Sequence, residues 1–344
     1  MRKNYLFIFG GLVLTLTAVL TVMGFKFEKT EQEKQEGLAD QYDVSTQDTI
    51  AFVSYKRGKP GLYIFNNKLD INEKAIEFDN SKSIIDPSFS NDGTKLAFIT
   101  ANKNLEKDLA STVHLLDLRT KQVTELFKSE HMVTELDFSP VSDSLFFLGA
   151  GTFGNYSPIA SKRTHDLDVF EYKLEEKETV QRTSLKKYSM TSLNVSPDGK
   201  SVFIQMDDDM DASTPEETFE TKQRVFEIAL DDPKKLNVVT DPDKEIDITE
   251  LVLSPSGNEL IYQSISNPYE GKTFKYELFS YHLNSKKEHQ LTHFGNFVGR
   301  PRFGSNGSLY FIADKKWPNR KDNHLYRMDD KSKEIKEVIL PEKE

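Results

Sequence analysis

The sequence contains no cysteine among its 344 residues. This excludes disulfides, thiolate metal sites, cysteine nucleophiles and the lipid-modified N-terminal cysteine of a bacterial lipoprotein. Positive charge is also in deficit, since 45 Lys and Arg residues against 55 Asp and Glu residues give a formal net charge of −10. Because such a surface repels phosphates, we expect no nucleic-acid partner.

Sequence motifs of known catalytic and cofactor sites are missing as well. There is no Gly-x-Ser-x-Gly nucleophile elbow, no phosphate-binding glycine loop and no His-Glu-x-x-His pair. The seven histidines are scattered and have no metal-ligand spacing. We therefore expect no cofactor and assign no catalytic residue, although these absences do not decide whether the protein is an enzyme.

Long apolar runs are absent except at the N-terminus, where the 21 residues Tyr5–Phe25 contain no charge. As a helix, this run would be about 30 Å long, which is one hydrocarbon thickness. Arg2 and Lys3 precede it, so the bias of positive charge places the N-terminus in the cytoplasm and the rest of the chain outside. We expect a membrane-anchoring helix over residues 1–25 of a single-pass protein, with a cleaved signal peptide and a secreted product as the alternative.

The next segment, residues 26–41, is rich in Lys, Glu and Gln and poor in large apolar residues. It cannot bury enough surface to fold alone, so we interpret it as a polar stalk. The remaining residues, 42–344, form one predicted domain.

Within that domain a short turn recurs six times, and each copy is preceded and followed by a short apolar strand. In the clearest copy, Ser196-Pro197-Asp198-Gly199, proline presets a turn angle, aspartate bonds back to the backbone and glycine tolerates a positive φ. The six copies are Ser45–Asp48, Ser90–Gly93, Ser139–Asp143, Ser196–Gly199, Ser254–Gly257 and Gly304–Gly307. Their starts are 45, 49, 57, 58 and 50 residues apart.

Each copy continues into a third strand, such as Gly61–Phe65, and a fourth, such as Gln122–Leu126. The β-branched and aromatic residues in near alternation are typical of strands. Six copies of four antiparallel strands predict an all-β, six-bladed β-propeller. The first copy starts with an inner strand, Tyr42–Val44, and the last ends with an outer strand, Ile335–Ile339, so we expect the ring to close by face packing without a shared strand.

The repeat resembles the TolB-type propeller repeat, a WD40-like pattern in which Ser-Pro-Asp-Gly lies between two short strands and Gln-Leu-Thr ends the copy. Ser196–Gly199 matches that turn fully, and Gln290–Thr292 matches the end of a copy. The other copies are degenerate, and the first lacks the proline and the glycine. The resemblance spans residues 42–340 and implies the propeller more strongly than it implies the role of TolB, whose separate N-terminal domain is replaced here by the apolar segment.

The loops between the second and third strands of each copy vary most in length, and in a propeller they lie on one face. Such one-sided elaboration is typical of a binding face, with tolerated insertion drift as the alternative. The loop 149–168 combines glycines and aromatic residues, and the loop of the sixth copy holds the only tryptophan. Our candidate partner-binding residues are Phe153, Tyr156, Arg163, His165, Trp317 and Arg320.

An acidic loop in the fourth copy offers weak metal-ligand candidates, Asp207, Asp209 and Asp211. Carboxylates suit calcium, but the glycine and the spacing of a calcium loop are absent, so a solvated acidic loop is the simpler interpretation.

These observations favour an extracytoplasmic, membrane-anchored, non-catalytic module that binds a protein or a cell-envelope glycan. The alternative is a hydrolase or lyase with a carboxylate and histidine site at the mouth of the propeller channel, and a structural role in the envelope is a third interpretation.

Overall fold

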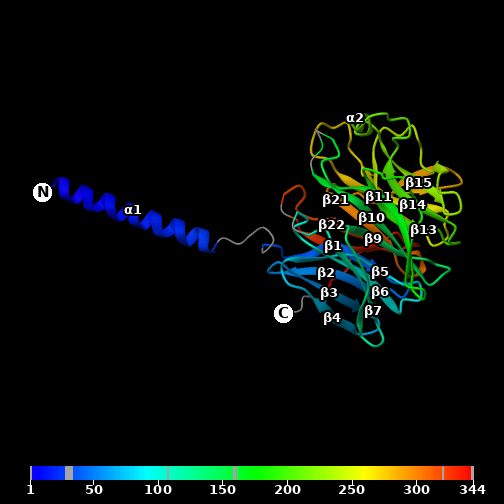
Figure 1. Ribbon diagram of the computed structural model, residues 1–344, viewed down its shortest axis with the longest axis horizontal. Helices are drawn as coiled ribbons and strands as arrows, with labels where there is room; N and C mark the ends of the chain where they lie inside the picture. The colour runs from blue at the N-terminus through cyan, green and yellow to red at the C-terminus, as the bar shows by residue number, and fades with distance from the viewer. Residues whose placement is uncertain are drawn as a thin grey trace.

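The computed structural model describes residues 2–27, 34–106, 108–157, 160, 162–319 and 321–341. The chain begins with helix α1 (Arg2–Phe27) and continues almost entirely as strands (Figure 1). The expected N-terminal helix is thus present, but no helix among the described residues is long and apolar enough to cross a bilayer.

The strands follow one another in groups of four that we call units, and the first strand of each unit is its inner strand. The first three units comprise β1 (Gly37–Val44), β2 (Ile50–Lys56), β3 (Lys59–Asn66) and β4 (Ile71–Glu77); β5 (Lys82–Phe89), β6 (Lys95–Asn102), β7 (Ser111–Asp117) and β8 (Val123–Ser129); and β9 (Val133–Phe138), β10 (Ser144–Gly154), β11 (Arg163–Lys173) and β12 (Glu178–Gln181).

The remaining units comprise β13 (Met190–Val195), β14 (Ser201–Asp207), β15 (Gln223–Ala229) and β16 (Leu236–Val238); β17 (Ile248–Leu253), β18 (Glu259–Ile265), β19 (Tyr276–His282) and β20 (Lys287–Gln290); and β21 (Phe297–Phe303), β22 (Leu309–Asp314), β23 (Asn323–Met328) and β24 (Ile335–Glu337). A short helix α2 (Pro215–Thr218) interrupts the fourth unit, and a 3-10 turn η1 (Ser305–Gly307) follows β21.

Neighbouring strands within each unit pair antiparallel, in sequence order. Four units are separate sheets, and the last two are joined into an eight-stranded sheet by a single parallel pair, Tyr276 with Phe297. The inner strands contact one another in a closed series, β1–β5–β9–β13–β17–β21 and back to β1. Four-stranded antiparallel sheets around such a ring are the arrangement of a β-propeller.

The hydrophobic core lies between successive units. One cluster combines Leu62 and Ile64 of the first unit with Phe98 of the second, and another combines Leu148 of the third with Ile204 of the fourth, all of them buried. Because successive side chains of a strand point to opposite faces, a central strand such as β18 must be apolar on both sides to pack against both neighbours. This explains the continuous apolar runs after each predicted turn.

The ring closes between the first and last units without a shared strand, as expected. Tyr42 and Phe52 pack against Tyr310 and Ile312 in the same kind of cluster that joins consecutive units. Asp48, in the first turn, also accepts hydrogen bonds from the backbone N–H (2.9 Å) and the hydroxyl (2.6 Å) of Ser305 in the last turn. Packing and a polar bond between turns therefore replace strand exchange.

Two predicted boundaries differ from the structure. Strand β1 begins at Gly37, so residues 37–41 of the expected stalk belong to the first sheet. The expected loop 149–168 is mostly strand, because β10 and β11 pair as far as Gly154 with Arg163. The glycines and polar residues there suggested a loop, yet cross-strand pairing extends the hairpin and leaves only a short connection at its tip.

Replacing Asp48 tests the closure. Asp48→Ala should lower the free energy of unfolding by about 1–3 kcal/mol, because two partly buried donors of Ser305 lose their charged acceptor. Burial opposes ionisation of Asp48, but its bonds to Lys68 and Ser305 outweigh this and lower its pKa. The contribution is therefore present above the unfolded pKa of aspartate and is lost as the pH falls through the lower folded value.

Urea unfolding of the Asp48→Ala and Asp198→Ala variants provides the measurement and its control. Asp198 occupies the same kind of turn but bonds only to Ser196 and Lys200 within that turn. Equal losses in both variants would contradict a special role of Asp48 in closure.

Candidate functional site

Polar residues of the inner strands line the centre of the ring. In four inner strands, β5, β13, β17 and β21, the pairing register shifts at a non-glycine residue with positive φ: Asp86 (42°), Ser192 (61°), Glu250 (47°) and Arg300 (56°). A β-bulge with a left-handed residue redirects that side chain relative to its neighbours. The bulges thereby direct polar side chains into the channel instead of into the apolar core.

Polar side chains of the inner strands connect one unit to the next by accepting backbone N–H groups. Asp43 accepts from Phe89 (2.7 Å), Asp137 from Val195 (2.6 Å) and Asn194 from Leu253 (2.9 Å). The same relation holds for Gln41 with Asp86, Asp86 with Leu136, Glu135 with Leu193, Ser192 with Leu251 and Glu250 with Arg300. These backbone donors next to the channel thus each meet a side chain of the preceding unit.

Two arginines of the last unit place positive charge next to these acidic side chains. The guanidinium nitrogens of Arg302 lie 3.6 Å from a carboxylate oxygen of Asp43 and 3.5 Å from one of Asp86. Those of Arg300 lie 3.4 Å from a carboxylate oxygen of Glu250 and 3.7 Å from one of Asp40. The hydroxyl of Tyr42 also donates to the carbonyl oxygen of Arg300 at 2.6 Å. The last unit is therefore bound to the first by charge as well as by packing.

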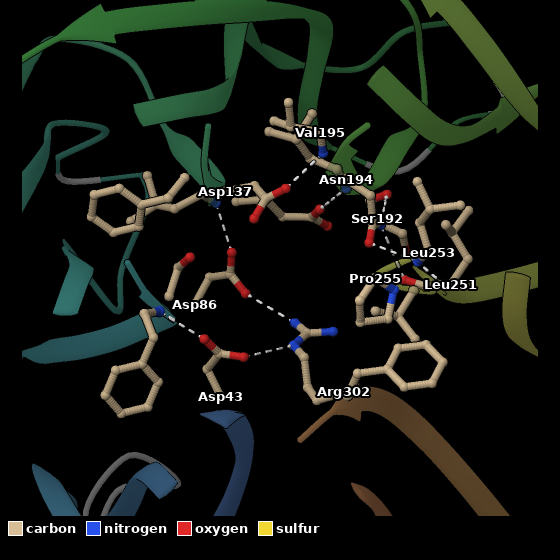
Figure 2. Close-up of a pocket in the computed structure, with 18 of the residues that line it drawn as sticks. Asp43, Asp86, Asp137, Ser192, Asn194, Val195, Leu251, Leu253, Pro255 and Arg302 are labelled. Atoms are coloured by element: carbon tan, nitrogen blue, oxygen red, sulfur yellow. Dashed lines mark hydrogen bonds and ion pairs between the residues drawn. The ribbon is translucent and has the colours of Figure 1, made fainter. Parts of the chain in front are cut away.

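The channel residues surround a pocket of about 300 Å³. Figure 2 shows Asp43, Asp86, Asp137 and Arg302 pointing toward one another inside it. Residues of the turns after the inner strands, including Pro197 and Pro255, also line the pocket. The pocket therefore lies at the end of the ring that carries the short turns, opposite the loops between second and third strands.

Burial and mutual repulsion hold the pocket carboxyl groups partly protonated near neutral pH. Burial raises the pKa of Asp43 to about 6 in spite of Arg302, and it raises the pKa of Asp137 to about 8. Burial and the charge of Asp86 raise the pKa of Glu135 to about 7. Groups with pKa values in this range can donate or accept a proton at physiological pH.

This arrangement allows two kinds of role. One oxygen of each of these carboxyl groups binds a backbone N–H, which is a structural use, while raised pKa values are also found in catalytic acids. Within the described residues, no group of three or more potential ligand side chains is arranged to hold a metal ion. No histidine lines the pocket, so the carboxylate and histidine pair expected for an enzyme is not assembled there.

Four predicted partner-binding residues lie around the tip of the β10–β11 hairpin. Tyr156 contacts His165 (ring centroids 5.3 Å apart), Tyr188 (4.7 Å) and Phe219 (6.2 Å). Arg163 is exposed and stacks on Tyr188, whereas His165 is buried and bonds to Asp166. The ring of Phe153 is half-buried beneath the ammonium group of Lys162. Tyr156 and His165 therefore join the third and fourth units rather than standing free.

The other predicted residues do not converge with this group. Trp317 packs on Tyr276 and Phe297 and donates to the carbonyl oxygen of Phe274 at 3.0 Å, so it caps the fifth and sixth units. Arg320 lies outside the described residues.

The weak metal candidates have other partners or are exposed. Asp207 accepts from Gln223, Asp209 pairs with Lys187, and Asp211 points to solvent. They therefore do not assemble as a ligand set.

The channel residues are not among the predicted site residues, although the sequence contains a signal for them. The residue two positions before each turn's first residue is polar in five of the six copies: Asp43, Ser88, Asp137, Asn194 and Arg302, with Val252 as the exception. A polar residue between two apolar ones is also what ordinary half-exposed strands show. Only alignment of all copies would have separated the two cases.

Comparison with known proteins supports the fold and no more. No family model matches the sequence, and no curated protein sequence gives a significant match. The chain has a TolB-like β-propeller fold. TolB from Acinetobacter baumannii is 13% identical with a TM-score of 0.57, over 91% of this chain and 66% of that one.

Propellers of enzymes are also similar to this fold, with slightly lower TM-scores. The propeller domain of the Trilobed protease from Pyrococcus furiosus, described as having an open velcro topology, is 17% identical (TM-score 0.52) over 89% of this chain and 84% of that one. An oligogalacturonate lyase in complex with manganese is 12% identical (TM-score 0.53) over 83% and 75%. Identities this low establish a shared fold but no shared activity.

The raised pKa values predict a stability that depends on pH. Asp137 keeps its proton to about pH 8 in the folded chain, whereas an unfolded aspartate loses it near pH 4. This contribution to stability is complete below the unfolded pKa and is lost as the pH rises through the folded one. Asp137→Asn should therefore raise the free energy of unfolding at pH 8 by about 1–2 kcal/mol. Its thermal midpoint should be higher than that of the wild type at pH 8 and should fall less between pH 5 and pH 8.

Asparagine should preserve the bond to Val195, because Asn194 makes the equivalent bond in the next unit. Differential scanning calorimetry at several pH values provides the measurement, and Asn194→Asp should produce the opposite change. A midpoint that is unaffected by pH in the wild type would disprove the assignment.

Proposed function

We propose that this protein is a non-catalytic binding module that holds a protein or envelope-glycan partner on the face formed by the loops between second and third strands. The carrying observation is the exposure of large apolar side chains there: Met210 (61%), Phe219 (38%), Tyr269 (83%) and Phe274 (45%). Such side chains cost free energy in water and are enriched where proteins meet partners.

The geometry of this face supports the proposal. Met210 and Phe219 belong to the connection between β14 and β15, and Tyr269 and Phe274 to the connection between β18 and β19, in the next unit. The ring of Phe219 contacts Tyr188, and the carbonyl oxygen of Phe274 accepts a hydrogen bond from Trp317, so aromatic residues hold both loops in place. We include Phe153, Arg163 and Trp317 in the same face as contributors to binding.

A second candidate function is catalysis by the channel carboxyl groups, as in a hydrolase or lyase. The observation that favours it is the presence of Asp43, Glu135 and Asp137 in one pocket with pKa values raised to about 6, 7 and 8. Their bonds to the backbone favour the structural role, because a catalytic group must be free to exchange protons with a substrate. Turnover of any glycan or peptide that Glu135→Gln abolishes would reverse this preference.

We also propose, from the repeat in the sequence, that the eight-stranded sheet represents two blades and that the propeller has six. The uncharged run Tyr5–Phe25 behind Arg2 and Lys3 supports export of the propeller across the cell membrane. The segment then either remains as an anchor or is removed as a signal peptide.

Determining the mature N-terminus of the native protein tests the proposed location. An intact N-terminus in the membrane fraction is the expected result for an anchor, and a start after Gly24 indicates a signal peptide. An intact chain in the cytoplasmic fraction would refute export altogether.

The binding face is tested with a double variant, Tyr269→Ser and Phe274→Ser. Capture of a partner from envelope extract by the full-length protein should fall at least about tenfold, since exposed aromatic anchors typically supply 1 kcal/mol or more each. Val141→Ser is the matched control, because Val141 is 62% exposed but belongs to a short turn at the opposite end of the ring. Unchanged capture by the double variant, or equal loss in the control, would refute this face.

A further inference from the structure

A second cavity, separate from the channel, lies between the second and third units and has a volume of about 500 Å³. We propose that it is a binding site for a neutral pyranose unit of a glycan. This inference rests on the part of the proposed function that names a glycan as partner, but it depends on residues other than those of the exposed face. The volume lies within the range of small-ligand sites, about 300–1,000 Å³.

The hollow arises from two glycines on one side of β10. Residues 147, 149 and 151 of β10 face the same side of the strand, and Gly149 and Gly151 have no side chain to fill the space there. A Cβ on Gly149 would lie 2.9 Å from the ring of Phe170, so that ring packs over Gly149, whereas a Cβ on Gly151 would meet only Asp166 within 4 Å. The sequence of β10 therefore creates an indentation that an ordinary strand would fill.

The inner end of the cavity is aromatic. Phe147 and Phe170 are paired across β10 and β11 and are stacked, with centroids 5.2 Å apart and planes 13° apart. Phe127, from the outer strand of the second unit, approaches Phe147 at 5.1 Å. Phe127 and Phe170 are only half-buried, and both border the cavity. They offer flat apolar surface to a ligand that has an apolar face of its own.

The outer end of the cavity is polar and has both signs of charge. Asp166 accepts from Thr152 at 2.7 Å; burial opposes its ionisation, but the bonds to Thr152 and His165 outweigh this and lower its pKa, so it is ionised. Lys186 is exposed on the same rim, close enough to act on the charge of Asp166. Gln181, which is paired with Phe170 across β11 and β12, donates to the carbonyl oxygen of Thr183, and this bond orients its amide.

This balance selects a neutral ligand. A net charge of either sign would meet like charges in the lining, from Asp166 and Asp168 or from Lys128 and Lys186. A hydroxyl group both donates and accepts, so several hydroxyls can satisfy a carboxylate, an amide and an ammonium group together. A pyranose combines such hydroxyls with one apolar face of C–H groups, which matches the aromatic end. A free sugar and a glycan chain share this chemistry.

Saturation-transfer NMR with the full-length protein tests the site. The probes are glucose as a free sugar, the neutral trimers cellotriose, maltotriose and chitotriose, and two charged trimers, of galacturonate and of glucosamine. At least one neutral trimer should bind, and glucose should bind as well if a single unit suffices. Gln181→Ala should weaken binding about three- to tenfold, as expected for loss of one hydrogen bond.

Filling the hollow provides the decisive variant. Gly151→Val should reduce binding more than about tenfold, because the new side chain occupies the cavity, while valine suits a strand and keeps the fold. Its Cβ would lie 3.4 Å from Asp166, which is close to ordinary contact. Gly154→Val, on the same strand but outside the cavity, is the matched control and should bind as the wild type does.

The outcomes separate this site from the exposed face. Binding of the charged trimers alone, absence of binding by every neutral probe, or unchanged affinity in Gly151→Val would overturn the proposal. Tyr269→Ser should leave saccharide binding unchanged, because Tyr269 lies outside the cavity. Partner capture lost in Tyr269→Ser together with retained sugar binding would thus support both sites independently.

Discussion

The alignment of the ring depends on one recurring interaction, in which a side chain of one inner strand accepts a backbone N–H of the next; among the described residues it joins every inner strand except β21 to its successor. Inner strands line a channel and lack a strand partner on the channel side, so the N–H groups directed there need another acceptor. Asp43, Asp137 and Asn194 supply it at equivalent positions, and Asp86 and Glu250 supply it from bulges. The apolar clusters between units give the larger share of stability, while these bonds fix how the units are aligned.

This requirement explains why a carboxyl-rich channel need not be an active site. Carboxylate and amide oxygens are short, strong acceptors, so acidic residues accumulate wherever backbone donors must be satisfied near an axis. Burial, together with repulsion from neighbouring carboxylates, then raises the pKa of Asp137 and Glu135, and the charges of Arg302 and Arg300 offset part of this rise. The two ends of the ring differ. One end has the charged pocket among short turns, and the other has exposed apolar side chains on long loops.

Much of the architecture could be predicted from the sequence, because the repeated turn imposes the same local geometry in each copy. The apolar strand after each turn, the order of strands and the closure by packing follow from local pattern and from the completeness of the first and last copies. The extension of β10 and β11 could not be predicted, because pairing of Thr152 with His165 depends on a partner strand rather than on local propensity.

The functional residues were harder to predict for a related reason. Asp86 and Glu250 reach the channel only because bulges turn them there, and their local sequences contain no glycine that would have indicated a positive φ. The burial of His165 and the support of Trp317 by Tyr276 likewise depend on neighbouring units. The channel, the aromatic cluster at the hairpin tip and the cavity beside β10 all combine residues from two or more units.

Closure without strand exchange has a consequence for how such a chain changes over evolutionary time. Each unit is formed by one uninterrupted stretch of sequence, so duplication or loss of a gene segment adds or removes a whole unit without rethreading the others. A propeller in which the two ends of the chain share a sheet would instead lose that sheet whenever one end was altered. Here the first and last units meet through packing and through the bonds from Ser305 to Asp48, so neither unit takes a strand from the other.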